Sequence, residues 1–154
     1  MSNRQSLVIT LFFIVVSADG GIALAPLSAL ISASDRSLLV TDQSILKSRQ
    51  NKHLLHALRQ ADCPLDRTRL VIDQYQTNSG LDADRTAALL DLDLMATLSG
   101  KLQAREEAMN AGEAMFENAP RDTYCRDVRD LTHQLTGQPV DAVSPSGLLG
   151  RLFK

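Results

Sequence analysis

The chain has 154 residues, a formal net charge of −2 and an apolar fraction of 44%. This length suffices for one domain with a sizeable core, and the composition is ordinary for a globular protein. With few aromatic residues and no tryptophan, the sequence offers no base-stacking platform, and its charge gives no general attraction to nucleic acid or membranes. We therefore do not expect nucleic acid to be the partner.

The first segment allows two interpretations. Arg4 is followed by an apolar run over residues 7–16 and then by Ser17-Ala18-Asp19. This order imitates a secretory signal, which would make the mature protein a secreted domain that begins at Asp19. The run is too short to span a membrane as a helix, and its β-branched residues suit a strand buried on both faces. We favour the strand, because the rest of the chain has the pattern of a cytosolic α/β domain.

The middle of the chain alternates helical and extended patterns. In chain order we expect a helix over 26–34, a strand over 38–41, a helix over 44–61, a strand over 69–73, a helix that begins at Asp82, a strand over 94–98, a helix over 102–112 and a last helix between Asp122 and Gly137. This alternation predicts an α/β fold, a partial three-layer parallel sheet of about four strands with helices on both faces. Such sheets usually carry a ligand at the carboxyl ends of their strands.

The apolar spacing also predicts which helix faces are buried. For the helix over 26–34 these residues are Ala29, Leu30 and Ala33, and for the helix over 44–61 they are Ile45, Leu54, Leu55 and Leu58. We expect the α/β domain to cover residues 1–137, followed by a linker over 138–146 and a short amphipathic tail over 147–154. The tail sets Leu149 and Phe153 beside basic residues, a pattern typical of a segment that enters a membrane surface or a partner's groove. A frayed end is the alternative.

The helix over 44–61 is distinctly basic. The residues that we expect to contact a partner there are Lys47, Arg49, Lys52, His56 and Arg59. Such a patch suits an acidic partner or nucleic acid, and its alternative is a solvated outer face. The helix is our first choice for a contact site.

Metal and redox chemistry find little support in the sequence. His53 and His56 are three residues apart, so both could reach one metal ion, but no cysteine or acid is spaced to complete the set. A surface pair is the simpler reading. Cys63 and Cys125 form no Cys-x-x-Cys pair, so a reduced cytosolic pair and a disulfide both remain open.

The order of several segments resembles the MinD/ParA-type ATPases and, within that superfamily, the TadZ/CpaE group of Flp/tad pilus-assembly proteins. The stretches that carry this resemblance are 35–44, 69–75, 108–115, 119–122 and 147–153. The resemblance implies a protein of pilus assembly or polar positioning that resides in the cytoplasm, at the inner face of the membrane or the cell pole. Its implied partners are pilus-assembly proteins, a full-length homologous ATPase or a second copy of the chain.

The chain departs from that family where the nucleotide would bind. No Walker A loop is present, so nothing neutralises the phosphates of ATP. Ser17 stands where the family has the acid of its switch-II strand, although Asp19 is close by, and Asp73 replaces the asparagine that would face the base. We keep Asp19 and Asp73 as weak nucleotide-facing positions, each with a plain turn or strand end as the alternative.

These departures predict a protein that does not hydrolyse ATP by itself and that acts by docking onto other proteins. We expect no cofactor, since ATP and magnesium would bind only if another segment supplied the phosphate loop. The alternative is an ATPase fragment completed by such an upstream segment.

Overall fold

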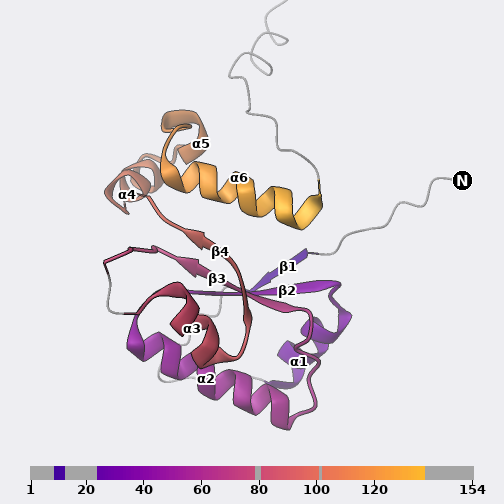
Figure 1. Cartoon of the computed structure of the whole chain (residues 1–154). Helices are drawn as coiled ribbons and strands as arrows, with labels where there is room; N and C mark the ends of the chain where they lie inside the picture. Colours follow the sequence, from indigo (N-terminus) through magenta and orange to yellow (C-terminus); the bar gives the residue numbers. More distant parts are fainter. Residues whose placement is uncertain (1–8, 13–23, 79–80, 101, 138–154) are drawn as a thin grey trace, which may run out of the picture. The chain divides into compact units, whose positions relative to one another are not determined.

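The computed structural model describes residues 9–12, 24–78, 81–100 and 102–137. Its strands, in sheet order, are β1 (Ile9–Phe12), β2 (Arg36–Thr41), β3 (Thr68–Asp73) and β4 (Asp93–Leu98). The β1–β2 and β2–β3 pairs are parallel, with Leu11 opposite Leu38 and Leu39 opposite Leu70. Figure 1 shows the sheet with helices beside it. The predicted α/β class with a parallel sheet is confirmed.

The chain divides into two units, Met1–Thr97 and Leu98–Lys154. The helices of the first unit are α1 (Leu24–Ala33), α2 (Ile45–Gln60) and α3 (Ala83–Leu90), and Figure 1 shows all three on the same side of the sheet. The helices of the second unit are α4 (Leu102–Ala111), α5 (Met115–Asn118) and α6 (Thr123–Thr136).

The core of the first unit lies between the sheet and its helices. The main cluster consists of Leu39, Leu55, Leu70, Ile72, Ala83 and Leu90, and a second cluster of Ile31, Leu54, Leu58 and Cys63. Val71 alternates with Leu70 and Ile72 along β3 and is 1% exposed, so this strand is shielded from water on both faces. A doubly shielded strand explains why the sequence shows a continuous apolar run there and no polar alternation.

The predicted helix faces are wrong at two places. All three predicted residues of α1, Ala29, Leu30 and Ala33, are exposed, because α1 packs through Leu27 and Ile31, which lie on another side of the helix. Ile45 is 63% exposed, whereas Leu54 is buried with its predicted neighbours. Leu54 follows Ile45 by nine positions, and at 3.6 residues per turn this spacing sets the two side chains on opposite sides of α2.

The second unit is held together by contacts around the start of α6. The helix α6 opens after Asp122, as predicted, and the Asp122 carboxylate caps it by accepting a hydrogen bond from the Tyr124 amide at 2.9 Å. The Arg105 guanidinium of α4 lies over the Tyr124 ring at 4.1 Å. The Ser99 amide donates to the Asp127 carboxylate at 2.8 Å and fixes the chain after β4 against α6.

The predicted linker and tail, with Leu149 and Phe153, lie outside the described residues, as do the two flanks of the predicted first strand. None of the described helices has the length and apolar content needed to cross a membrane.

Candidate interaction site on the second helix

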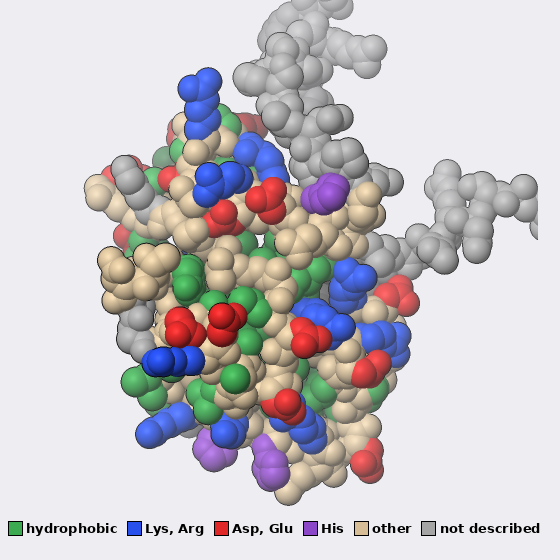
Figure 2. Space-filling model, viewed as in Figure 1, with side chains coloured by type: hydrophobic (Ala, Val, Ile, Leu, Met, Phe, Trp, Pro, Cys, Tyr) green, Lys and Arg blue, Asp and Glu red, His purple; other side chains and the backbone are tan. Residues whose placement is uncertain are grey.

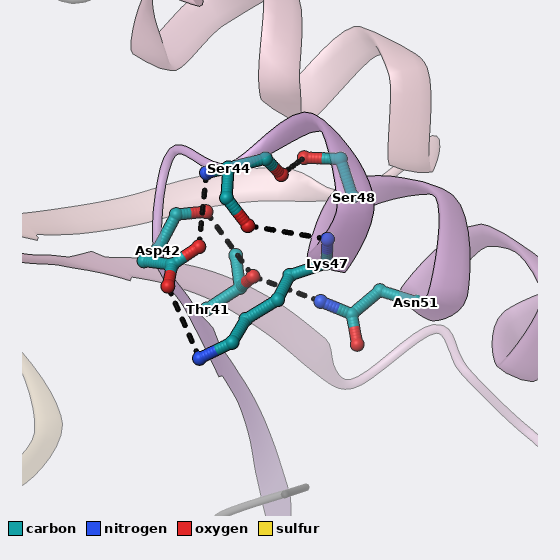
Figure 3. A network of polar contacts seen from close by, with 6 residues as sticks. All are labelled: Thr41, Asp42, Ser44, Lys47, Ser48 and Asn51. Atoms are coloured by element: carbon teal, nitrogen blue, oxygen red, sulfur yellow. Dashed lines mark hydrogen bonds and ion pairs between the residues drawn. The ribbon is translucent and has the colours of Figure 1, made fainter. Parts of the chain in front are cut away.

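The helix α2 begins at a strand end, where its first turn is fixed by local polar contacts (Figure 3). Ser44 is the N-cap, and its hydroxyl accepts a hydrogen bond from the Lys47 amide at 3.2 Å. The Asn51 amide donates to the Thr41 hydroxyl oxygen at 2.9 Å, and both side chains are buried. These contacts fix the rotation of α2 about its axis, since one buried polar pair must meet across the strand–helix turn.

Asp42 adds an electrostatic contact to the same turn. Its carboxylate accepts from the Ser44 amide at 2.9 Å and pairs with the Lys47 ammonium at 3.1 Å. Partial burial by itself would raise the pKa of Asp42, but the hydrogen bonds from Ser44 and Lys47 and the positive charge of Lys47 outweigh it and hold that pKa below its usual value. Lys47 is therefore engaged within the turn, and it does not line the hollow described next.

A second contact joins this turn to the loop after β3. The Gln43 amide nitrogen donates to the carbonyl oxygens of Leu81 at 2.7 Å and Gln76 at 3.2 Å. The Gln43 Oε1 atom accepts from the Gln76 amide at 2.7 Å. One side chain thus ties together the loops that follow β2 and β3, the region where parallel sheets usually carry ligands.

The outer side of α2 and the adjoining side of α3 enclose a surface hollow of ≈ 490 Å³. It is lined by Arg49, Lys52, His53, His56, Arg59, Ala88, Leu89 and Asp91. Figure 2 shows histidine and Lys/Arg side chains gathered at the lower side of the view, where Figure 1 shows α2. We call this site the basic hollow. It brings together four of the five predicted contact residues of this helix.

Within the basic hollow, Arg59 has an internal partner. Its Nη2 atom donates to the carbonyl oxygens of Leu90 at 3.3 Å and Asp91 at 3.1 Å, and it pairs with the Asp91 carboxylate at 3.1 Å. Asp91 is the C-cap of α3 and has a left-handed φ of 55°. A cation at the C-terminal end of a helix satisfies the last carbonyls and the helix dipole. Arg59 therefore holds α3 against α2.

The other basic side chains of the hollow are not neutralised from within. In the described part of the chain, no ion pair involves Arg49, Lys52, His53 or His56. The two histidines line the same hollow, but the described residues contain no group of three or more side chains placed to hold a metal ion. The hollow thus presents positive charge at an apolar floor that includes Leu89.

Exposed apolar residues beside this charge were missed by the sequence analysis. Ile45 and Leu46 are exposed in the first turn of α2, one turn before Arg49, and Leu89 lines the basic hollow. The sequence did contain a signal for Ile45 and Leu46, because two consecutive residues of a helix point about 100° apart and so cannot both point directly into the core.

The two predicted nucleotide-facing positions remain predictions. Asp73 ends β3, is half-buried and does not line the basic hollow. Asp19 lies outside the described residues.

Comparison with known proteins places the fold. No protein-family model matches the sequence, and no curated protein matches it. A ParA-family ATPase from Chlorobium tepidum TLS is similar over 69% of this chain and 45% of its own, with 19% identity and a TM-score of 0.60. The MinD cell division protein of Aquifex aeolicus matches 71% of this chain and 47% of its own, with 13% identity and a TM-score of 0.59. The MinC:MinD complex of the same organism matches at 13% identity, a TM-score of 0.58, and 71% and 46% of the two chains. The chain thus has the fold of these proteins and spans less than half of their length.

Proposed function

We propose that the chain is a protein of the MinD/ParA superfamily, related to the TadZ/CpaE group, that serves Flp/tad pilus assembly or polar localisation by docking onto other proteins. In this proposal it works in the cytoplasm, at the inner face of the membrane or the cell pole, and hydrolyses no ATP by itself. The shared fold and the ordered sequence segments around 35–44 and 69–75 support this assignment.

The observation that carries the docking proposal is the basic hollow. Arg49 and Lys52 have no acidic partner in the described residues, while the Leu89 side chain beside them is exposed. Cations at a partly apolar surface gain most from a partner that brings carboxylates and buries the apolar part. The partner that suits this surface is therefore an acidic, amphipathic protein segment. A full-length homologous ATPase and a pilus-assembly protein are the candidates.

Binding of these candidates to the immobilised chain tests the proposal. We expect at least one purified pilus-assembly protein or full-length homologous ATPase from the source organism to bind, and Lys52→Glu to weaken this binding by about tenfold, since it opposes like charges. Arg121→Glu makes the same change of charge at an exposed residue outside the hollow and should leave binding unchanged. Docking through the hollow is refuted when no candidate binds, or when both variants bind as tightly as the original chain.

A second candidate function is supported by the lengths of the matched proteins. Because the chain aligns with less than half of the ATPases that it matches, it could bind ATP together with a segment that carries the phosphate loop. Titration with a fluorescent ATP analogue and magnesium, of the folded chain alone and of the chain mixed with a segment that carries a phosphate loop, separates the two proposals. Docking without nucleotide predicts no saturation by either sample, whereas saturation at micromolar analogue only in the mixture supports the second function.

A further inference from the structure

Most of the large exposed apolar side chains lie on two surfaces of the molecule, with Leu30 of α1 as the exception. The large ones among the described residues are Leu30, Ile45, Leu46, Leu89, Leu102 and Met109. Leu89 lines the basic hollow, and Ile45 and Leu46 lie in the first turn of α2, just before the α2 residues that line the hollow. Leu102 and Met109 both belong to α4 of the second unit. Exposed apolar groups that gather in this way mark surfaces that bind another protein.

The outer face of α4 combines these apolar groups with negative charge. Ala108 is the buried residue of the helix, whereas Leu102 is 45% and Met109 is 78% exposed. Glu106 is exposed as well and falls between them at the i, i+4, i+7 spacing of one helical stripe. No ion pair of the described residues uses Glu106. We call Leu102, Glu106 and Met109 the α4 stripe.

The α4 stripe and the basic hollow are complementary in charge and in length. Leu102 and Met109 are seven residues apart, which corresponds to roughly 10 Å along a helix, and Ile45 and Lys52 have the same separation on α2. With Met109 over Ile45, the stripe would bring Glu106 to the level of Arg49. Arg49 and Glu106, which have no ion-pair partner among the described residues, would then face each other.

We propose that the basic hollow of one copy of this protein binds the α4 stripe of a second copy. This inference rests on the docking function proposed above and names its occupant. Every copy carries both surfaces, so the contact joins unlike faces. Two copies can satisfy both contacts reciprocally in a dimer, or copies can add head to tail.

Charge reversal tests this contact in the full chain by sedimentation equilibrium, from low micromolar to submillimolar concentration. We expect the original chain to self-associate, more weakly at high salt. Arg49→Glu and Glu106→Lys should each weaken association by about tenfold or more, because each opposes like charges at the contact. The chain with both changes restores opposite charges and should regain association. An equimolar mixture of the two single variants should also associate, because one copy offers an acidic hollow and the other a basic stripe.

Arg121→Glu is the matched control and should associate like the original chain, and circular dichroism verifies that every variant is folded. A chain that stays monomeric throughout, or a double variant that stays as weak as the single ones, overturns the proposal. These outcomes are distinct from failure of the docking function. A monomeric chain whose Lys52→Glu variant loses a pilus-assembly partner would keep that function and would remove only the second copy as occupant.

Discussion

Arg59 and Lys52 lie on the same side of α2, but only Arg59 has partners within the fold. Arg59 binds two carbonyl oxygens and the carboxylate at the end of α3, whereas Lys52 has no ion-pair partner among the described residues. We predict that Arg59→Gln destabilises the fold and that Lys52→Gln does not. The comparison separates a cation that supports the hollow from one that is available to a partner.

The loss expected for Arg59→Gln follows from its contacts. An exposed ion pair contributes roughly 0.2–1 kcal/mol, and a charge at a helix C-terminus about 0.3–1 kcal/mol. Since Arg59 is 39% exposed, solvent screening keeps its sum with the Asp91 pair near 1 kcal/mol. At a urea dependence of about 1.5 kcal/mol per molar, the unfolding midpoint should fall by roughly 0.7 M. Lys52→Gln, at an exposed position, should stay within about 0.5 kcal/mol of the original chain.

Urea unfolding followed by circular dichroism measures both values. Arg59→Lys is an informative third variant, because it keeps the charge and loses the planar fork that reaches several acceptors, so its midpoint should fall between those of Arg59→Gln and the original chain. An unchanged midpoint in Arg59→Gln, or an equal loss in Lys52→Gln, would refute this division of roles.

Three further predictions concern other parts of the chain. Gly100→Ala should lower the melting temperature, since the backbone at Gly100 has a φ of +101° and an added Cβ would lie 2.6 Å from Asp122 Oδ1; an unchanged melting temperature would contradict this contact. The lowered pKa of Asp42 means that its ionised carboxylate stabilises the fold, fully above the ordinary aspartate pKa and less as pH falls through the lowered pKa. Asp42→Asn should therefore be less stable than the original chain at pH 6, and this difference in urea unfolding should shrink towards pH 3. Cys125 is fully buried, and burial raises the pKa of its thiol although Arg129 opposes the shift, so a thiol reagent at pH 8 should modify it only as fast as the chain opens.

Helices whose ends are capped by residues close in the sequence could be predicted. Asp82 and Asp122 each accept a hydrogen bond from the first turn of the helix that follows, and Gly137 ends α6 with a left-handed φ of 67°. These contacts join near neighbours in the chain, so a short window of sequence contains both partners. The α5 helix has four residues and an N-cap, Ala114, without a side-chain hydrogen bond, so the sequence carried no signal for it.

The candidate site could be predicted only as a set of residue types. A basic helix was evident, but its internal contacts were not, because Arg59 binds Leu90 and Asp91 from another helix, more than 30 residues away in the chain. Which cations stay available therefore depends on how α2 and α3 pack. The rotation of α2 depends in the same way on the buried pair of Thr41 and Asn51, which decided that Ile45 faces water.

The contact made by Gln43 has a consequence for how this protein can vary. Gln43 contacts the loop after β3 solely through main-chain atoms of Gln76 and Leu81, so substitutions there, other than proline at Gln76, keep these hydrogen bonds. A substitution at position 43, by contrast, would break these hydrogen bonds. Glutamate could accept from the Gln76 amide but could donate to neither carbonyl, and asparagine is one methylene shorter. Among descendants of this sequence, the loop should diverge quickly while the glutamine that holds it is inherited unchanged.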